Sequence, residues 1–332
     1  MDYEPGQNEA FKVETLSTWL NFRIHTFLYE RRIKKILREP WDMVHCWEEP
    51  YIFAGWQICK NTPSKVPLAI FTAQNIEKRY PFPFSRIERY CLNRCAGWMP
   101  VGQTTLEAQL KRGYGIRPQR VIPLGVDLEI FFPSVAARAA TLNQLSWPQE
   151  GPPILGYLGR FTEEKGIHTL CNALDSVKSP WRALFVGSGP FETQLREWAK
   201  QFGDRIRIVT GVPHDRVPAH LNAMDLLCAP SETRPFWKEQ FGRMVTEAFA
   251  CGVPVIGSNS GEIPHVISDA GCIVAEGDVK AWAACIEDLL ESPAKRKSYS
   301  EKGLERARTV FSWSKVAQNT LSFFEELMQR KN

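Results

Sequence analysis

The sequence contains no long apolar run. Nothing near its N-terminus has the apolar stretch of a signal peptide, and no segment approaches the roughly 18 consecutive apolar residues of a membrane-spanning helix. We therefore expect a cytoplasmic protein, either free or at the inner surface of the membrane.

Cysteine pairs with the spacing of metal ligands are also missing. The nine cysteines include no C-x-x-C pair and have no His-x-His partner nearby. The closest pair, Cys91 and Cys95, has the i,i+4 spacing of a helix and is typical of half-buried thiols. The pattern predicts no disulfide, no bound metal ion and no cofactor.

The excess of positive charge is small, with 41 Lys and Arg against 37 Asp and Glu. An excess of this size does not predict nucleic-acid binding. It lies in the first half of the chain, where five basic residues gather beside the apolar positions of a predicted helix: Arg31, Arg32, Lys34, Lys35 and Arg38. Such a cluster is typical of a solvated helix face or, alternatively, of peripheral association with an anionic membrane.

The length of 332 residues and an apolar content of 44% predict two domains. In both halves short apolar segments alternate with helical ones, which predicts parallel sheets. In the first half we expect helices at 11–38, 82–95 and 103–112, and strands at 43–45, 67–71, 97–101 and 120–124. In the second half we expect strands at 154–158, 183–186, 206–209, 226–229, 255–257 and 272–274, and a final amphipathic helix at 314–331.

Two cations follow a glycine at the end of the predicted strand 154–158. They are Arg160 and Lys165, after Gly159. Glycine lets a ligand approach the backbone closely, the next helix offers free N–H groups, and two cations can neutralise a diphosphate without a metal. A plain strand-to-helix turn with surface charges explains this segment equally well.

A Gly187-Ser188-Gly189 turn follows the next predicted strand. The third glycine of a dinucleotide-binding fingerprint is missing, because Phe191 and Glu192 stand where it would fall. A nicotinamide-dependent oxidoreductase with two doubly wound domains therefore remains only a rival interpretation.

Two carboxylates eight residues apart form the most informative pattern. Glu239 lies in a predicted loop, and Glu247 lies inside the following predicted helix among Val245, Ala248 and Phe249. An unpaired carboxylate in such apolar surroundings is costly, so a surface role does not explain Glu247. Carboxylates near a helix N-terminus are natural acceptors for the vicinal hydroxyls of a sugar or a ribose.

In order and spacing, residues 150–320 resemble glycosyltransferase family 4, the retaining enzymes of the GT-B fold. The resemblance is carried by Gly159-Arg160 with Lys165-Gly166, Gly187-Ser188-Gly189, Thr210-Gly211-Val212, Asp225, Pro230-Ser231, and the E-x7-E pair Glu239 and Glu247. It implies an α/β protein with two Rossmann-like doubly wound domains facing a cleft. It also implies transfer of a sugar from a UDP- or GDP-linked donor to an acceptor hydroxyl with retained anomeric configuration, in surface polysaccharide or glycolipid biosynthesis.

The resemblance implies a role for each residue on the donor side. Arg160 and Lys165 would contact the donor diphosphate and stabilise the leaving group, and Glu239 would bind the hydroxyls of the donor sugar; these three are the expected catalytic residues. The other expected donor-binding residues are Gly159, Gly187, Gly211, Val212, Phe241, Gly242 and Glu247, with Glu247 on the ribose.

The first half resembles the family less fully. The expected acceptor-side residues are His45, Glu48, Gln74 and Asn75. The family often has a second histidine where this chain has Trp47, and many relatives have a histidine where Gln74 or Asn75 stands. An amide can bind the hydroxyls of a carbohydrate or lipid-linked acceptor, but it cannot transfer a proton.

We expect four parts of the chain, with the linker placed where the periodicity stops and Pro133, Pro148 and Gly151 occur. These are an acceptor-side domain at 1–133, a linker at 134–150, a nucleotide-sugar domain at 151–312, and a helix at 313–332 that packs back toward the first domain. The family normally begins with strands that this sequence lacks, so we expect an incomplete N-terminal sheet. A degenerate homologue that binds a nucleotide or a partner without turnover is the alternative.

Overall fold

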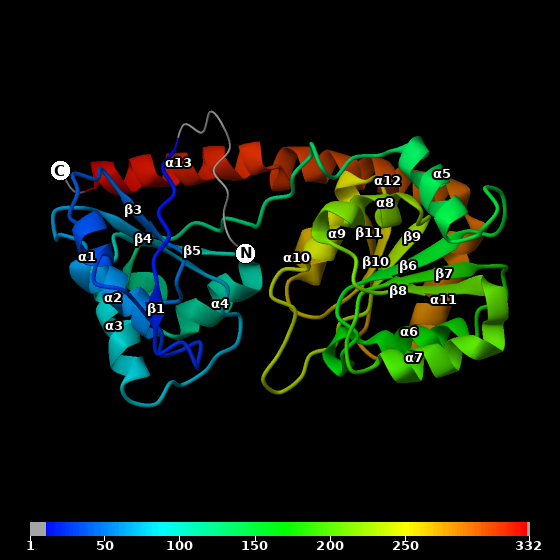
Figure 1. Ribbon diagram of the computed structural model, residues 1–332, viewed down its shortest axis with the longest axis horizontal. Helices are drawn as coiled ribbons and strands as arrows, with labels where there is room; N and C mark the ends of the chain where they lie inside the picture. Colours follow the sequence, from blue (N-terminus) through cyan, green and yellow to red (C-terminus); the bar gives the residue numbers. More distant parts are fainter. Residues whose placement is uncertain (1–10, 331–332) are drawn as a thin grey trace.

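The computed structural model describes residues 11–330 and consists of two α/β lobes (Figure 1). The N-terminal lobe contains a three-stranded sheet, and the C-terminal lobe contains a six-stranded sheet. The last helix, α13 (Trp313–Gln329), leaves the C-terminal lobe and runs along the N-terminal one. None of the helices in residues 11–330 combines the length and the apolar character needed to cross a membrane.

The N-terminal sheet is parallel, with strand order β3-β4-β5. Its strands are β3 (Val44–Cys46), β4 (Leu68–Thr72) and β5 (Gly97–Pro100). All five residues of β4 are buried, as expected for a central parallel strand covered on both faces. Leu68 and Ile70 pack on the side of the helices α1 (Ile33–Ile36), α2 (Phe53–Asn61) and α3 (Phe84–Arg94), whereas Ala69 and Phe71 share a core with α13.

Two features of this lobe differ from the sequence prediction. The prediction of a helix over 11–38 is wrong. Only the short α1 forms there, after a small antiparallel pair of strands, β1 (Thr18–Trp19) and β2 (Leu28–Tyr29). Trp19, Phe22 and Ile24 are exposed, so the apolar stripe has no core to pack on and the helix gains no tertiary support.

The strand predicted at 120–124 is also absent. Arg120 and Ile122 do donate backbone hydrogen bonds to Trp98 and Pro100 of β5, at 3.3 and 3.0 Å. The pairing amounts to an isolated bridge between Gln119 and Trp98, so the segment runs beside β5 without forming a regular strand. Helix α4 (Gln103–Lys111) and a single turn at Tyr114–Ile116 complete the lobe.

The C-terminal lobe is doubly wound around a parallel sheet of order β11-β10-β9-β6-β7-β8. The strands are β6 (Ile154–Leu158), β7 (Arg182–Val186), β8 (Ile206–Val209), β9 (Leu226–Ala229), β10 (Val255–Ser258) and β11 (Gly271–Val274), all within one residue of the predicted bounds. The order in which successive strands are added to the sheet reverses between β6 and β9. In such sheets, ligands bind at this point, outside the carboxyl ends of the strands.

Helices cover both faces of this sheet (Figure 1). One face carries α6 (Ile167–Leu174), α7 (Glu192–Ala199) and α11 (Val279–Glu291). The other carries α8 (Val217–Asn222), α9 (Arg243–Ala250), α10 (Ile263–Ile267) and α12 (Pro293–Arg306). Continuous apolar strands such as β6 are therefore buried on both sides.

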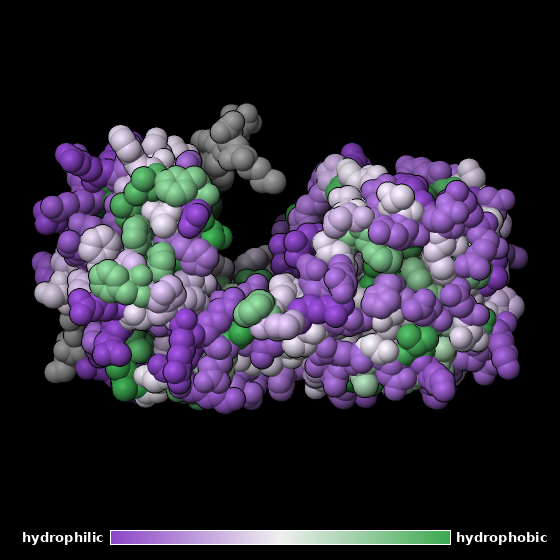
Figure 2. All heavy atoms as spheres, turned by 90° about the horizontal axis from the view of Figure 1, so that it is seen from below, coloured by the Kyte–Doolittle hydropathy of each residue, from purple (hydrophilic) through white to green (hydrophobic). Residues whose placement is uncertain are grey.

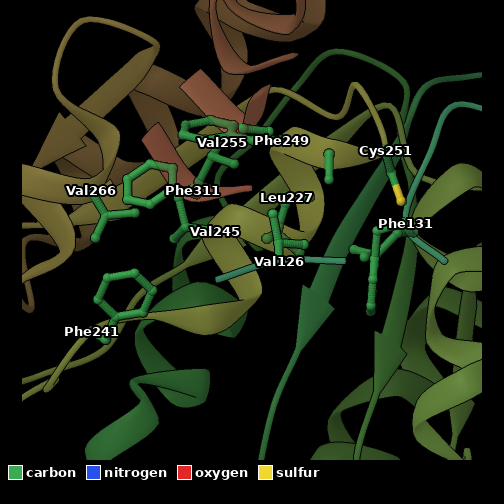
Figure 3. Packing of buried hydrophobic residues seen from close by; sticks show 14 of the residues in the cluster. Val126, Phe131, Leu227, Phe241, Val245, Phe249, Cys251, Val255, Val266 and Phe311 are labelled. Carbon is green, nitrogen blue, oxygen red and sulfur yellow. The ribbon is translucent and has the colours of Figure 1, made fainter. Parts of the chain in front are cut away.

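The chain crosses between the lobes at two places that lie side by side. The first passage contains Val126, whose N–H donates to the carbonyl of Phe311 at 2.7 Å in the returning passage. Val126, Phe131 and Phe311 pack with Val245 and Phe249 of α9 in one cluster (Figure 3). The two passages are thus joined by both a hydrogen bond and a shared core.

The segment 134–150 is not irregular, although we predicted it as a linker. It contains α5 (Val135–Gln144), which packs against α8. Ser134 caps this helix, and Arg138 forms an ion pair with Asp225 of the C-terminal lobe at 3.1 Å. The prolines and glycine that suggested a linker stand outside the helix.

Candidate active site

A cavity of about 600 Å³ lies at the carboxyl end of β6, beside the hollow that separates the two lobes in Figure 2. Seven of the residues predicted for the donor side line it: Gly159, Arg160, Lys165, Glu239, Phe241, Gly242 and Glu247. Three others do not: Gly187, Gly211 and Val212. Leu124 is the one lining residue among the described residues that precedes the C-terminal lobe.

The glycines at the ends of β6 and β7 bring two backbone turns into contact. A Cβ at Gly187 would lie 1.8 Å from the carbonyl oxygen of Gly159, so only glycine fits there. The N–H of Phe161 then donates to the carbonyl of Ser188 at 2.8 Å. Gly187 therefore shapes the turn that presents Arg160, whose side chain is two-thirds exposed beside Glu164.

Lys165 and Glu239 form the central ion pair of the cavity. Their Nζ and Oε2 atoms are 2.6 Å apart, and both side chains are nearly buried. The hydroxyl of Ser231 donates to the same carboxylate oxygen at 2.9 Å. The arrangement fixes a cation and an anion next to each other, which suits a ligand that carries both a phosphate and hydroxyl groups.

The loop that carries Glu239 is held by three contacts to the carbonyl oxygen of this residue. Its carbonyl oxygen accepts from the N–H of Glu262 at 3.1 Å and from the side-chain amide of Asn75 at 2.8 Å. A Cβ at Gly261 would lie 1.9 Å from that oxygen. The loop ends at Gly242, a left-handed residue with φ of 87°. Gly242 has no side chain to cap α9, so the first N–H groups of this helix can bind an anion.

Glu247 lies on α9 and is 8% exposed. Burial raises the pKa of its carboxyl group to about 7. Arg243, one turn earlier, reaches it at 3.4 Å and stabilises the ionised form in part. Glu247 and Arg243 also line an adjoining cavity of about 250 Å³ that extends toward Asp127 and Trp313, so the carboxylate stands between two connected spaces.

The remaining donor-side residues lie near the next strand end. Gly187 donates its N–H to the carbonyl of Val209, the last residue of β8. Gly211 has φ of 69° and open space around its Cα, whereas Val212 packs on the core. His214, which was not among the expected site residues, lines both cavities. Its position three residues after Gly211, in the loop that follows a strand, was the available signal.

The four acceptor-side candidates do not meet in one place. His45 accepts a hydrogen bond from the indole of Trp47 at 3.1 Å and packs against Phe324 of α13. Glu48 accepts from the hydroxyl of Tyr29 on β2. Neither of these side chains lines the cavity that holds Glu239.

The two amides follow β4 and are both buried. Gln74 donates to the hydroxyl of Tyr80 at 3.2 Å and accepts from the N–H of Ile76 at 3.1 Å. Asn75 is the only one of the four candidates within the described chain that contacts the donor side, through its hydrogen bond to the Glu239 carbonyl.

Glu262 is a contact between the lobes that the sequence did not reveal. Its carboxylate accepts from the N–H groups of Gln103 and Thr104, at 2.7 and 2.8 Å, and from the Thr104 hydroxyl at 2.6 Å. These groups form the N-terminus of α4, where a negative charge is favoured. The carboxylate is 4% exposed and lies directly before α10 in the C-terminal lobe. It therefore ties the two lobes together beside the Glu239 loop.

Within residues 11–330, no group of three or more His, Cys, Asp or Glu side chains is arranged to hold a metal ion.

Comparison with known protein families identifies the C-terminal half. Residues 143–306 match the family model of glycosyl transferases group 1. This part of the chain is therefore similar to the group 1 glycosyltransferases. The donor-side residues from Gly159 to Glu247 all fall within the matched range.

Several relatives of known name are glycosyltransferases. A GDP-mannose-dependent monoacylated alpha-(1-6)-phosphatidylinositol monomannoside mannosyltransferase of Corynebacterium glutamicum is 28% identical over 68% of this chain and 61% of its own length. A D-inositol 3-phosphate glycosyltransferase of Xylanimonas cellulosilytica is 32% identical over 70% of this chain and 57% of its own. The chain thus spans about three-fifths of the length of these relatives.

Solved glycosyltransferase structures share the arrangement of both lobes. A sucrose-phosphate synthase from Thermosynechococcus elongatus superimposes with a TM-score of 0.72 at 25% identity, over 91% of this chain and 77% of that one. The two Rossmann-like lobes facing a cleft are the GT-B fold, as the sequence predicted.

Proposed function

We propose that this chain is a retaining glycosyltransferase of family 4. It transfers a sugar from a UDP- or GDP-linked donor to a hydroxyl of a carbohydrate or lipid-linked acceptor, in surface polysaccharide or glycolipid biosynthesis. The observation that carries the proposal is the single cavity that collects Arg160, the Lys165–Glu239 pair and Glu247. These residues come from separate strand ends and from a helix, yet they converge on a space that fits a nucleotide sugar.

The two cations act on the donor diphosphate. When the bond between the anomeric carbon and the phosphate oxygen breaks, negative charge grows on the departing diphosphate. Arg160 is exposed and can reach this group, and the N-terminus of α9 points its free N–H groups to the same cavity. Interactions that strengthen as charge develops lower the barrier, so these groups stabilise the transition state more than the bound donor.

The two carboxylates position the donor. Glu239, held by Lys165 and Ser231, has its other oxygen available for hydroxyl groups of the sugar. Glu247 in its ionised form accepts two hydrogen bonds from the vicinal hydroxyls of the ribose. Both side chains are restrained by their surroundings, so the donor is oriented without loss of much side-chain entropy.

Retention follows if the acceptor attacks the face that the diphosphate leaves. Asn75, the candidate that contacts the Glu239 loop, is an amide and cannot accept the acceptor's proton. In our proposal the leaving phosphate oxygen accepts this proton, and Asn75 helps to hold the Glu239 loop. Contact between the lobes through Glu262 keeps water out of the reaction space.

We further propose that the protein works in the cytoplasm at the inner membrane surface. On the N-terminal lobe the basic residues Arg31, Lys34 and Lys35 are exposed, as are the apolar side chains of Phe22 and Phe82. Figure 2 shows apolar side chains gathered on the underside of this lobe. Basic and apolar groups together suit peripheral contact with anionic lipid.

Titration with UDP, GDP and ADP by calorimetry tests the donor site. We expect one nucleotide to bind and Arg160→Ala and Glu247→Ala each to weaken its binding strongly. Arg196→Ala serves as the matched control, because Arg196 forms a similar i,i+4 pair on the exposed surface of α7. Absence of binding by a folded chain, or equal loss in the control, would contradict the donor-site assignment. Binding without transfer or donor hydrolysis would instead favour a homologue that binds nucleotide without turnover.

A further inference from the structure

The N-terminal lobe contains a second large cavity that the proposed reaction does not use. It has a volume of about 650 Å³ and lies between α3, the segment 77–80 and the end of α4. Its charged lining is mostly basic: Lys78, Arg79, Arg89, Lys111 and Arg112, against Glu77 and Glu88. A concave surface lined by this excess of cations attracts anions.

Arg112 is the deepest of these cations. Its side chain is only 8% exposed, and one of its terminal nitrogens pairs with Glu88, which also accepts from the hydroxyl of Tyr114. The guanidinium carbon lies 4.5 Å from the centre of the Tyr80 ring, which stabilises the cation but offers no oxygen lone pair.

The other two nitrogens of Arg112, Nε and Nη1, are buried and have no hydrogen-bond partner among the described residues. Buried guanidinium N–H groups nearly always have acceptors, because leaving them unpaired is costly. Glu88 accepts from Nη2 of Arg112 and from Tyr114 through Oε1, and no hydrogen bond joins it to Nε or Nη1. The remaining N–H groups therefore indicate an acceptor that comes from outside the chain.

The cavity is connected to the reaction space through hydrogen bonds. Tyr80, stacked near Arg112, accepts from Gln74 at 3.2 Å, and the carbonyl of Gln74 accepts from Gln109 of α4 at 2.7 Å. Asn75, the next residue, bonds to the carbonyl of Glu239. A ligand held at Arg112 would therefore lie on the N-terminal side of the same strand end that meets the donor loop.

An apolar groove of about 530 Å³ lies on the other side of α3. Ile87 and Tyr90 of α3 face it, together with Phe53, Trp56 and Phe82, whereas Glu88 and Arg89 of the same helix face the basic cavity. One helix thus separates a space for an anion from a space for hydrocarbon. This arrangement fits a ligand in which a phosphate is joined to an apolar group.

We propose that the cavity around Arg112 binds a phosphate group, and, resting on the function proposed above, that this phosphate belongs to the acceptor. A phosphate matches the site because its several oxygens can accept from Arg112 while the rim cations Arg89 and Lys111 balance its charge. The phosphate is that of a lipid headgroup or of a soluble phosphate ester, and both use the same chemistry at Arg112.

The test compares binding of inorganic phosphate and glycerol 3-phosphate by calorimetry with binding to vesicles of phosphatidylglycerol. The rim variant Arg89→Gln/Lys111→Gln changes two exposed residues and should leave the fold intact. We expect it to weaken binding about tenfold, since two cations near the phosphate are lost. The matched control is Lys280→Gln/Lys297→Gln, which removes the same charge from exposed positions on α11 and α12 of the C-terminal lobe, and it should retain binding.

Further variants separate this cavity from the donor site. Arg112→Gln should abolish phosphate binding, with thermal unfolding used to check that the chain remains folded. Phosphate binding should survive in Arg160→Ala, which removes a cation of the donor cavity only. A lipid source is supported if vesicles bind and soluble phosphates do not, and a soluble acceptor is supported by the reverse result.

Two results would overturn the inference. One is the absence of binding by all three probes, and the other is equal loss in the rim variant and the Lys280→Gln/Lys297→Gln control. If a phosphate probe binds as expected but UDP, GDP and ADP do not, the cavity stands and the proposed transferase function fails. If a nucleotide binds and none of the three phosphate probes does, the reverse holds.

Discussion

The two lobes bury carboxylates in different ways. Burial raises the pKa of Glu49 in the N-terminal lobe and of Glu247 in the C-terminal lobe, each to about 7. Glu49 accepts from the hydroxyl of Thr72 at 2.7 Å and from the N–H of Ala73 at 2.8 Å, so its own lobe satisfies both oxygens. Among residues 11–330, Glu247 has only Arg243 as a side-chain partner, at 3.4 Å, and it faces a cavity.

This difference shows which buried carboxylate is available to a ligand. A similar pKa shift does not mean a similar function, because a carboxylate with two short hydrogen bonds from its own fold has a structural role already. Glu247 retains acceptor capacity where a ligand can reach it. The same contrast holds for the predicted residues in general: the donor side converges on one cavity, whereas most acceptor-side candidates bond within their own lobe.

The largest effect should come from breaking the donor side at Lys165. We expect Lys165→Ala to lower the rate of sugar transfer by about 10²–10³-fold, because it removes a charge that stabilises the leaving group and leaves Glu239 without its partner. Steady-state kinetics with the nucleotide sugar identified by titration checks this. Lys200→Ala, which breaks an exposed pair with Glu197, is the control and should stay near wild type. A loss below about tenfold would remove Lys165 from the expected catalytic residues.

A smaller loss should follow from separating the two lobes at Glu262. Glu262→Ala leaves the N–H groups of Gln103 and Thr104 without their acceptor, which costs about 1–3 kcal/mol of the contact between the lobes. We therefore expect kcat/KM to fall about tenfold while nucleotide affinity changes little. Small-angle scattering should show a larger radius of gyration.

The control for this prediction is an acid that bonds within one lobe. Glu276 accepts from the N–H and the hydroxyl of Thr233, and Glu276→Ala should leave the scattering profile unchanged. Gly102→Ala should act like Glu262→Ala, because a Cβ at Gly102 would lie 2.3 Å from the Glu262 carboxyl carbon. An unchanged radius in both Glu262→Ala and Gly102→Ala would show that this contact does not hold the lobes together.

The pH dependence of donor binding should reveal the ionisation of Glu247. Ribose hydroxyls donate to the carboxylate, so binding favours its ionised form. With its pKa raised to about 7, affinity should be highest above that value and fall as the pH drops through it. Between pH 8 and pH 6 the ionised fraction falls about tenfold, and Kd should rise accordingly. The control is Glu247→Gln, in which the nucleotide phosphates still titrate but residue 247 does not. If nucleotide affinity in this variant depends on pH as it does in the wild type, the ionisation of Glu247 does not control donor binding.

The C-terminal fold was readable from the sequence for a physical reason. Strands such as β6 and β9 are short apolar runs buried on both faces, and polar or small residues follow them. The segment 11–38 also has recurring apolar residues, but Trp19 and Phe22 remain exposed and only local pairing shapes the chain there. Periodicity predicts a helix only when a core exists to cover its stripe, and the sequence does not state where that core is.

The site was readable to the same extent. Arg160, Lys165 and Glu247 could be predicted because each stands in a fixed relation to a strand end or a helix. Glu262 could not, because its partners are backbone N–H groups of α4, 158 and 159 residues away in the other lobe. Contacts of side chains with distant backbone have no local signature in the sequence.

The smallest effect on sugar transfer should come from substitution of His45. This substitution tests whether the N-terminal lobe contributes this side chain to the reaction. Its ring packs against Phe324, and burial lowers its pKa to about 4, so the imidazole is neutral at physiological pH. Trp47, the donor to its Nδ1, is half exposed and can turn to water when the partner is lost. We therefore expect His45→Phe to change nucleotide affinity and transfer rate by less than about twofold, with a stability loss of about 1 kcal/mol measured by denaturant unfolding. A tenfold slower transfer with normal nucleotide binding would instead indicate that His45 contacts the acceptor. Packing against α13 would then position this ring for the acceptor and would not keep it out of the reaction.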